Sequence, residues 1–149
     1  IQEAGYVQHV TSKGNDGQAL FKDDSDFQEY LRLLKTARVL YPVKIYNFCL
    51  MSNHIHLLVE PLADGNLAKV MEMVTKEYAK YFNKKYKRSG HVFNGRYKSF
   101  LVQIERYFFN CSRYIDLNPQ KAHIVTEPKE YAWSGYSELA CGKKGAMEI

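Results

Sequence analysis

Two histidines in the middle of the sequence are spaced so that they could bind one metal ion. His54 and His56 are separated by a single residue in the short apolar segment 54–60 (HIHLLVE), which is typical of a β-strand. Because side chains alternate between the two faces of a strand, both imidazoles leave one face and Ile55 leaves the other. Such a pair can share a divalent cation, although strand histidines also occur as ordinary hydrogen-bonded residues of a sheet.

A tyrosine and an asparagine near the end of the sequence could complete such a site. Tyr114 and Asn118 are four residues apart in a segment with helical periodicity, so they lie about one turn apart on one side of the helix. If this helix covered the sheet face that carries His54 and His56, a phenol and an amide oxygen would reach the same place. The competing interpretation is a half-buried core tyrosine and an asparagine that ends the helix before Pro119.

The remaining pattern predicts the elements that position these residues. Segments rich in β-branched and aromatic residues predict strands at 6–11, 43–50, 54–60 and 97–102. Apolar residues with helical spacing predict helices at 23–40, 66–82 and 104–119. The last helix is expected to end where Pro119 removes a backbone donor.

This order of elements predicts an α+β fold. A βαββαβ order is that of the ferredoxin-like antiparallel sheet, here followed by an extra C-terminal helix that carries Tyr114. The first two helices would cover one face of the sheet, and the extra helix would cover part of the other face. That placement would bring the helix over the two histidines.

Length and composition indicate one ordinary globular domain, 1–149. The chain of 149 residues is 46% hydrophobic and contains no uninterrupted apolar run long enough to span a bilayer. No segment has the pattern of a signal peptide, and we expect a cytoplasmic protein without a membrane partner. Cys49, Cys111 and Cys141 are odd in number and far apart, which predicts reduced thiols rather than a metal or redox motif.

Positive charge is concentrated in the second half of the chain. Residues 1–75 contain 7 Lys and Arg against 9 Asp and Glu, whereas residues 76–149 contain 14 against 7. A basic half most often meets phosphates, although a solvated lysine-rich helix face would have the same composition. Cations alternate with aromatic residues in the segment 76–98, a mixture that suits a single-stranded backbone and its unpaired bases. We predict nucleic-acid contacts from five of these cations: Lys84, Lys85, Lys87, Arg88 and Arg96.

Several segments together resemble a known family. The segments 51–61 (MSNHIHLLVEP) and 114–119 (YIDLNP) resemble the two signatures of the single-tyrosine HUH transposases, named for their histidine, hydrophobic residue, histidine motif. The resemblance is closest to the group of REP-associated tyrosine transposases. Supporting matches extend along nearly the whole chain, at 9–15 (HVTSKGN), 90–99 (GHVFNGRYKS) and 132–136 (AWSGY). This ordered set is far more specific than a lone histidine pair.

The resemblance implies a metal-dependent endonuclease and strand-transferase that cuts and rejoins single-stranded DNA near hairpins. By the family's pattern, Tyr114 is the nucleophile, and a Mg²⁺ or Mn²⁺ ion is bound by His54, His56 and Asn118. Attack would leave the DNA 5′-phosphate on the tyrosine and release a 3′-hydroxyl. Lys13 stands where an arginine is commoner and is expected to contact a phosphate. The implied partner is single-stranded or hairpin DNA, and the protein could be a monomer or a homodimer.

Two other functions fit the same residues. A non-catalytic ferredoxin-like module could bind single-stranded nucleic acid, with His54 and His56 as sheet residues and Tyr114 in the core. An HUH nickase serving plasmid or viral replication would share the chemistry of a transposase. No general base for the tyrosine is evident in the sequence. Dependence of cleavage on a metal would separate the enzymes from the binding module.

Overall fold

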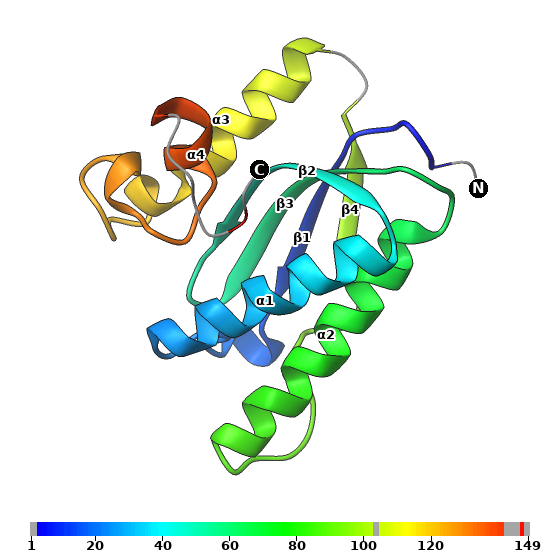
Figure 1. Ribbon diagram of the computed structural model, residues 1–149. Coiled ribbons are helices and arrows are strands. Elements are labelled where there is room, and N and C mark those ends of the chain that lie inside the picture. The colour runs from blue at the N-terminus through cyan, green and yellow to red at the C-terminus, as the bar shows by residue number, and fades with distance from the viewer. Residues whose placement is uncertain (1–2, 103–104, 142–146, 148–149) are drawn as a thin grey trace.

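The computed structural model describes residues 3–102, 105–141 and 147. Within them the chain forms four strands and four α-helices, joined in part by two short 3₁₀ turns (Figure 1). The elements are, in chain order, β1 (Gln8–Lys13), η1 (Asn15–Gly17), α1 (Asp24–Leu40), β2 (Val43–Leu50), β3 (His54–Pro61), α2 (Asn66–Lys85), β4 (Lys98–Leu101), α3 (Glu105–Lys121), η2 (Pro128–Glu130) and α4 (Tyr136–Cys141).

The four strands form one antiparallel sheet in the order β2-β3-β1-β4. Each βαβ unit is split, because β3 lies between β1 and β2 and β1 lies between β3 and β4. This confirms the predicted α+β, ferredoxin-like fold with an extra C-terminal helix. The first strand begins two residues later than predicted, since Gly5, with φ of 84°, lies in a turn that precedes it.

Helices cover the two faces of the sheet unequally (Figure 1). On one face, α1 and α2 pack side by side and enclose the main core with strand residues such as Val10 and Leu57. On the other face, α3 packs on β2 and β3 around a smaller cluster that includes Leu58 and Ile115. The helix that carries Tyr114 therefore lies over the face predicted from the sequence.

The boundaries of α1 follow from local chemistry. Asp23 precedes the helix in an extended conformation and its carboxylate accepts a hydrogen bond from the Asp26 backbone N–H at 3.1 Å. This is the role of an N-cap, which satisfies a backbone donor that the first turn leaves free. Pro42 follows shortly after the helix end at Leu40.

The prediction that α3 ends at Pro119 is wrong, because the helix continues through this proline to Lys121. A proline in the last turn removes only one backbone bond, and the ring of Pro119 is buried. The carbonyls of Asn118 and Pro119 still accept backbone hydrogen bonds at 3.0 Å from Ala122 and Ile124. Ile104, which the predicted helix included, lies outside the described residues.

Two remaining expectations can be compared with the described residues. None of the helices described is long and apolar enough to cross a membrane. Cys49 and Cys111 are free thiols, and the side chain of Cys141 lies outside the described part of the chain.

Candidate active site

The two histidines of β3 lie on the sheet face that α3 covers. Ile55 and Leu57 point into the main core on the opposite face. The rings of His54 and His56 are nearly perpendicular, with centroids 5.0 Å apart. The alternation of the strand thus places both imidazoles on one side, as the spacing predicts.

Tyr114 and Asn118 of α3 reach the same place. The Tyr114 ring lies edge-on to the His56 ring, with centroids 5.8 Å apart. The Asn118 side chain lies near enough to His54 to affect its pKa, and its Nδ2 donates to the Tyr114 carbonyl at 3.4 Å. Tyr114 remains 46% exposed, so the residue is accessible to a bound substrate. The structure therefore brings together all four residues predicted for the catalytic and metal-binding roles.

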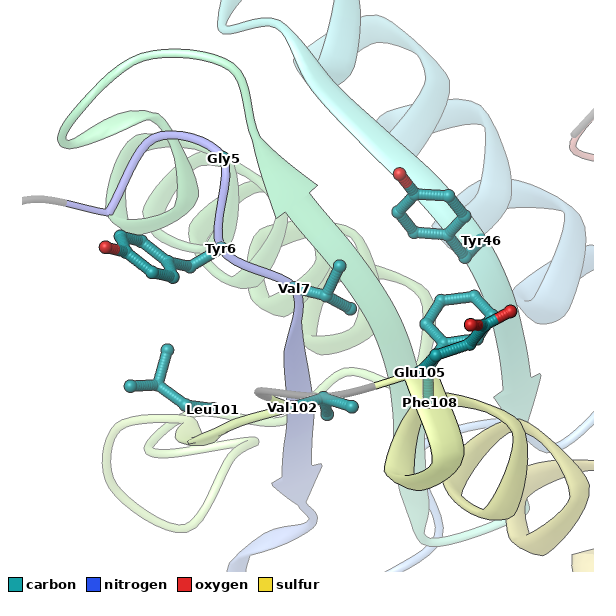
Figure 2. A pocket seen from close by; sticks show the side chains of 8 residues that line it. All are labelled: Gly5, Tyr6, Val7, Tyr46, Leu101, Val102, Glu105 and Phe108. Atoms are coloured by element: carbon teal, nitrogen blue, oxygen red, sulfur yellow. The ribbon is translucent and has the colours of Figure 1, made fainter.

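Three of these side chains, those of His54, His56 and Tyr114, border a cavity of about 390 Å³. It is lined by one phenol, two imidazoles, polar side chains and glycines, from residues Lys13, Gly14, Gly17, Asn53, His54, His56, Asn94 and Tyr114. A second hollow of about 560 Å³ lies where the start of α3 meets β1 and β2, with Tyr46 next to Phe108 (Figure 2). Glu105 is the one charged residue among those lining it, so this hollow does not suit a polyanion.

A third histidine that was not predicted for the site belongs to it. His9 of β1 stacks on His56 at 5.3 Å between ring centroids, and its Nε2 lies 3.1 Å from His56 Nδ1. Its ring is also 6.2 Å from the Tyr114 ring. The sequence signal available was the alternation of β1, which places His9, Thr11 and Lys13 on one face. The β1–β3 register was needed to show that this face is shared with His56.

Burial keeps the imidazoles of the site neutral. Desolvation lowers the pKa of His56 to about 3, with further lowering from His54, His9 and Lys13. Desolvation also lowers the pKa of His9. The pKa of His54 is lowered by burial and by Lys13, although the hydrogen bond with Asn118 opposes the shift. Neutral imidazoles have the lone pairs that metal coordination requires.

The donor atoms fit a divalent cation. His56 Nε2 is buried and has no hydrogen-bond partner, whereas buried polar atoms are normally paired. His54 Nδ1 lies 2.8 Å from Asn53 Oδ1, and the tautomer that donates from Nδ1 to this oxygen leaves a lone pair on Nε2 for a metal. No group of three His, Cys, Asp or Glu able to hold a metal occurs in the described part of the chain. The amide oxygen of Asn118, whose side chain lies near His54, is a donor that could join the two imidazoles.

A buried asparagine fixes α3 against the sheet. Asn47 follows a β-bulge in β2 and is fully buried. Its Nδ2 donates to Asp116 Oδ1 at 2.8 Å and to Ser112 Oγ at 2.9 Å, and its Oδ1 accepts from the Phe48 N–H. These hydrogen bonds fix how α3 is rotated about its axis and where it lies along the sheet, and both determine where Tyr114 points.

Replacing Asn47 is expected to destabilise the protein in a pH-dependent way. Asn47→Ala leaves the Asp116 carboxylate without this donor and should lower the free energy of unfolding by about 1–3 kcal/mol. Asn47→Asp adds a second carboxylate beside Asp116, whose pKa is already raised by burial. The Asn47→Asp variant should lose more stability at pH 8, where both groups are charged, than at pH 5, where one can hold a proton. Thermal unfolding at the two pH values measures this, and an equal loss at both would contradict it.

Five of the six predicted DNA contacts fall into three groups. Lys13 and Arg96 are exposed and line a small hollow of about 100 Å³ that adjoins the active-site cavity through Lys13 and Asn94. Lys84 and Lys87 are exposed at the C-terminal end of α2. Arg88 is half-buried, and its guanidinium donates to Asn83 Oδ1 and to the His91 carbonyl.

Lys85 is not a free cation. Its Nζ lies 2.8 Å from carboxylate oxygens of Asp23 and of the fully buried Asp26. The same carboxylate of Asp26 accepts from the hydroxyls of Tyr81 and Tyr86. The charge of Lys85 is thus already neutralised between α1 and α2, which removes the reason for predicting a phosphate contact there.

Substitution of Lys85 should change the stability of the protein, whereas substitution of Lys84 and Lys87 should change its DNA affinity. Lys85→Gln is expected to lower the free energy of unfolding, because buried Asp26 loses its cation, and to change DNA affinity less than about twofold. Reversing the charges of Lys84 and Lys87 together should weaken DNA binding by about tenfold and reduce its salt dependence. Thermal unfolding and fluorescence anisotropy at several salt concentrations measure both quantities. Weaker binding by Lys85→Gln with unchanged stability would contradict this assignment.

The chain is similar to known transposases in sequence and in fold. Residues 6–118 match the family described as "Transposase IS200 like", a range that includes His54, His56, Tyr114 and Asn118. A search of curated proteins found no match.

Two solved structures share the fold. A REP-associated tyrosine transposase bound to a REP hairpin superposes with a TM-score of 0.78 at 13% identity, over 91% of this chain and 79% of that chain. A candidate transposase from Deinococcus radiodurans has a TM-score of 0.50 at 13% identity, over 78% of this chain and 90% of that chain. At this level of identity the two structures support the fold, and the family match carries the identification. The chain belongs to the IS200-like transposase family.

Proposed function

We propose that this transposase cuts and rejoins single-stranded DNA through a covalent bond to Tyr114. The observation that carries the proposal is the convergence of an exposed phenol with the imidazole of His56, whose buried Nε2 has no protein partner. These groups come from α3 and β3, which are far apart in the sequence. A purely structural tyrosine and histidine would not require this arrangement.

The proposed reaction is a transesterification. The Tyr114 oxygen attacks the phosphorus of a phosphodiester, a new bond forms between them, and the bond from phosphorus to the 3′ oxygen breaks. The phenol proton leaves, and the released 3′ oxygen takes up a proton. The product is a 5′-phosphotyrosine, which retains the energy of the phosphodiester, so that a second 3′-hydroxyl can reverse the step at a new junction.

The chain's own residues would bind and orient the reacting groups. Packing of α3 on β2 and β3 holds the Tyr114 ring beside His56, which restricts the direction of attack. His54, His56 and Asn118 are the residues that would hold Mg²⁺ or Mn²⁺. Such an ion supplies positive charge that neutralises the phosphate oxygens. Lys13, exposed at the edge of the cavity, would add a further positive charge near the phosphate.

Hairpin DNA is the proposed substrate form. The REP-associated tyrosine transposase that shares this fold was solved bound to a REP hairpin. The exposed cations Lys13, Lys84, Lys87 and Arg96 of this chain fit a polyanionic partner. A hairpin flanked by single strands would offer a shaped stem for binding and an unpaired phosphodiester for cleavage.

Covalent trapping tests the proposal. Hairpin oligonucleotides from repeats flanking the gene, labelled at the 5′ or the 3′ end, are incubated with the protein and Mg²⁺, Mn²⁺ or EDTA and resolved on a denaturing gel. The expected result is a metal-dependent adduct that retains the 3′ label and releases the 5′-labelled fragment. Tight binding with no adduct under any of these conditions would favour a non-catalytic single-strand binding module.

A further inference from the structure

In the part of the chain that the structure describes, α3 covers mainly the β2 and β3 side of the sheet face that carries the active site. The helix α3 packs on β2 and β3, and the side chains of β1 and β4 on this face lie beside it. We call the residues Thr11, Lys13, Lys98 and Phe100 the open sheet face. Lys13 and Lys98 are exposed, and Phe100 is 60% exposed. The exposed ring of Phe100 offers an aromatic surface on which a base could stack.

The register places the open sheet face next to the candidate active site. Thr11 is opposite His56 on one side and Lys98 on the other, and Phe100 is opposite His9. Residues directly opposite in an antiparallel pair share a face and lie about 4.5–5.5 Å apart at Cβ. His9 in turn contacts both His56 and Tyr114. Across the sheet, His9 therefore lies between Phe100 and the Tyr114 ring.

The charge of this surface is positive. Lys13, Arg96 and Lys98 line one hollow of about 100 Å³ together with Thr11, Ser12 and Asn94. Lys13 and Asn94 also line the active-site cavity, so the two hollows adjoin. Among the described residues that line either hollow, none is acidic. A positively charged surface therefore extends from the active-site cavity toward β4.

We propose that the open sheet face binds the single-stranded DNA segment that adjoins the scissile phosphate, with one base stacked on Phe100 and the neighbouring phosphates at Lys98, Arg96 and Lys13. An aromatic ring beside several cations is the combination that binds single strands without base pairing. This inference rests on the proposed function, because it takes the reacting phosphate to be at Tyr114.

A second copy of the chain fits this surface less well than DNA does. A two-fold interface places the same patch of both copies face to face, so that Lys98 and Arg96 of one copy would meet the same cations of the other. Phosphates would instead neutralise these charges. The observed cations therefore favour a polyanion over self-association.

A fluorescent base tests stacking on Phe100. Oligonucleotides carrying 2-aminopurine at successive positions beside the cleavage site are titrated with Tyr114→Phe protein, which removes cleavage from the measurement. Stacking on the ring should quench the fluorescence at one position. Phe100→Leu should abolish this quenching and weaken binding by about five- to tenfold, whereas Phe100→Trp should retain both. Phe109→Leu is the matched control, because Phe109 is also 60% exposed but lies on α3.

Salt dependence tests the phosphate contacts. Lys98→Gln should reduce the slope of log affinity against log salt concentration by about 0.7, the value for one phosphate on a single strand. Lys69→Gln is the control, because Lys69 is an exposed lysine on α2, which covers the opposite face of the sheet. An unchanged slope for Lys98→Gln would overturn this part of the proposal.

The outcomes separate this inference from the proposed function. Suppose that Phe100→Leu binds DNA and quenches 2-aminopurine as the Tyr114→Phe protein does, while wild-type protein still forms the adduct. The proposed role of the open sheet face is then wrong, and the proposed function stands. If wild-type protein forms no adduct but a base is still quenched through Phe100, the proposed function fails, and the open sheet face stands only as a surface that binds single-stranded DNA. If Phe100→Leu alters the sedimentation of the protein but not its DNA affinity, the face is an interface between copies, and the inference is overturned.

Discussion

Tyr114→Phe is expected to abolish the covalent adduct and strand cleavage, a loss on the order of 10³-fold or more. The substitution removes only the hydroxyl, and the ring can keep its edge contacts with His9 and His56. Because Tyr114 is 46% exposed, loss of its hydroxyl leaves no buried polar partner unsatisfied. DNA affinity should therefore stay within about threefold of the wild-type value.

The measurement combines a denaturing gel for the adduct with fluorescence anisotropy for binding. Tyr107→Phe is the matched control, because Tyr107 is an exposed tyrosine of the same helix. We expect this control to cut and bind like the wild-type protein. An adduct formed by Tyr114→Phe would show that another residue is the nucleophile.

His56→Gln should remove metal binding and cleavage together. The Nε2 atom of His56 is the buried nitrogen without a protein partner, and glutamine cannot place an imidazole lone pair there. Mutation of an outer-shell partner already weakens metal binding by about 10- to 100-fold. Loss of a nitrogen that binds the metal directly should therefore weaken Mn²⁺ binding by about 100-fold or more. The metal-free protein should remain folded, since His56 is neutral and a neutral side chain replaces it.

Calorimetry with Mn²⁺ alone measures this loss independently of cleavage. His91→Gln is the control, because His91 is exposed in the loop after α2 and does not line the active-site cavity. If His56→Gln bound Mn²⁺ as tightly as wild-type protein, His56 would not be a metal ligand. If wild-type protein cleaved DNA fully in EDTA, the proposed reaction would not need a metal.

Features with a local cause could be predicted from the sequence. The shared face of His54 and His56 follows from the period of a strand, and the start of α1 follows from the Asp23 cap. The alternation of β and α segments was sufficient to predict the ferredoxin-like order. The spacing of Tyr114 and Asn118 likewise predicted that they share one side of a helix.

Other features depended on contacts between residues far apart in the sequence. His9 is 47 residues from His56, and only the β1–β3 register brings the two rings into contact. Lys85 belongs to a strongly basic segment, but its ion pairs are with Asp23 and Asp26, 62 and 59 residues away.

The course of α3 also depended on tertiary structure. Pro119 ends a helix by local rules, yet α3 continues past it because the proline ring is buried and later backbone donors bond to the carbonyls of the last turn. The position of Tyr114 over the histidines depends on Asn47, which bonds to Asp116 from 69 residues away. Periodicity and capping are properties of a few neighbouring residues and can be recognised in the sequence. The pairing register of strands and the partners of charged side chains are decided by the free energy of the whole packed chain, and so they required the tertiary structure.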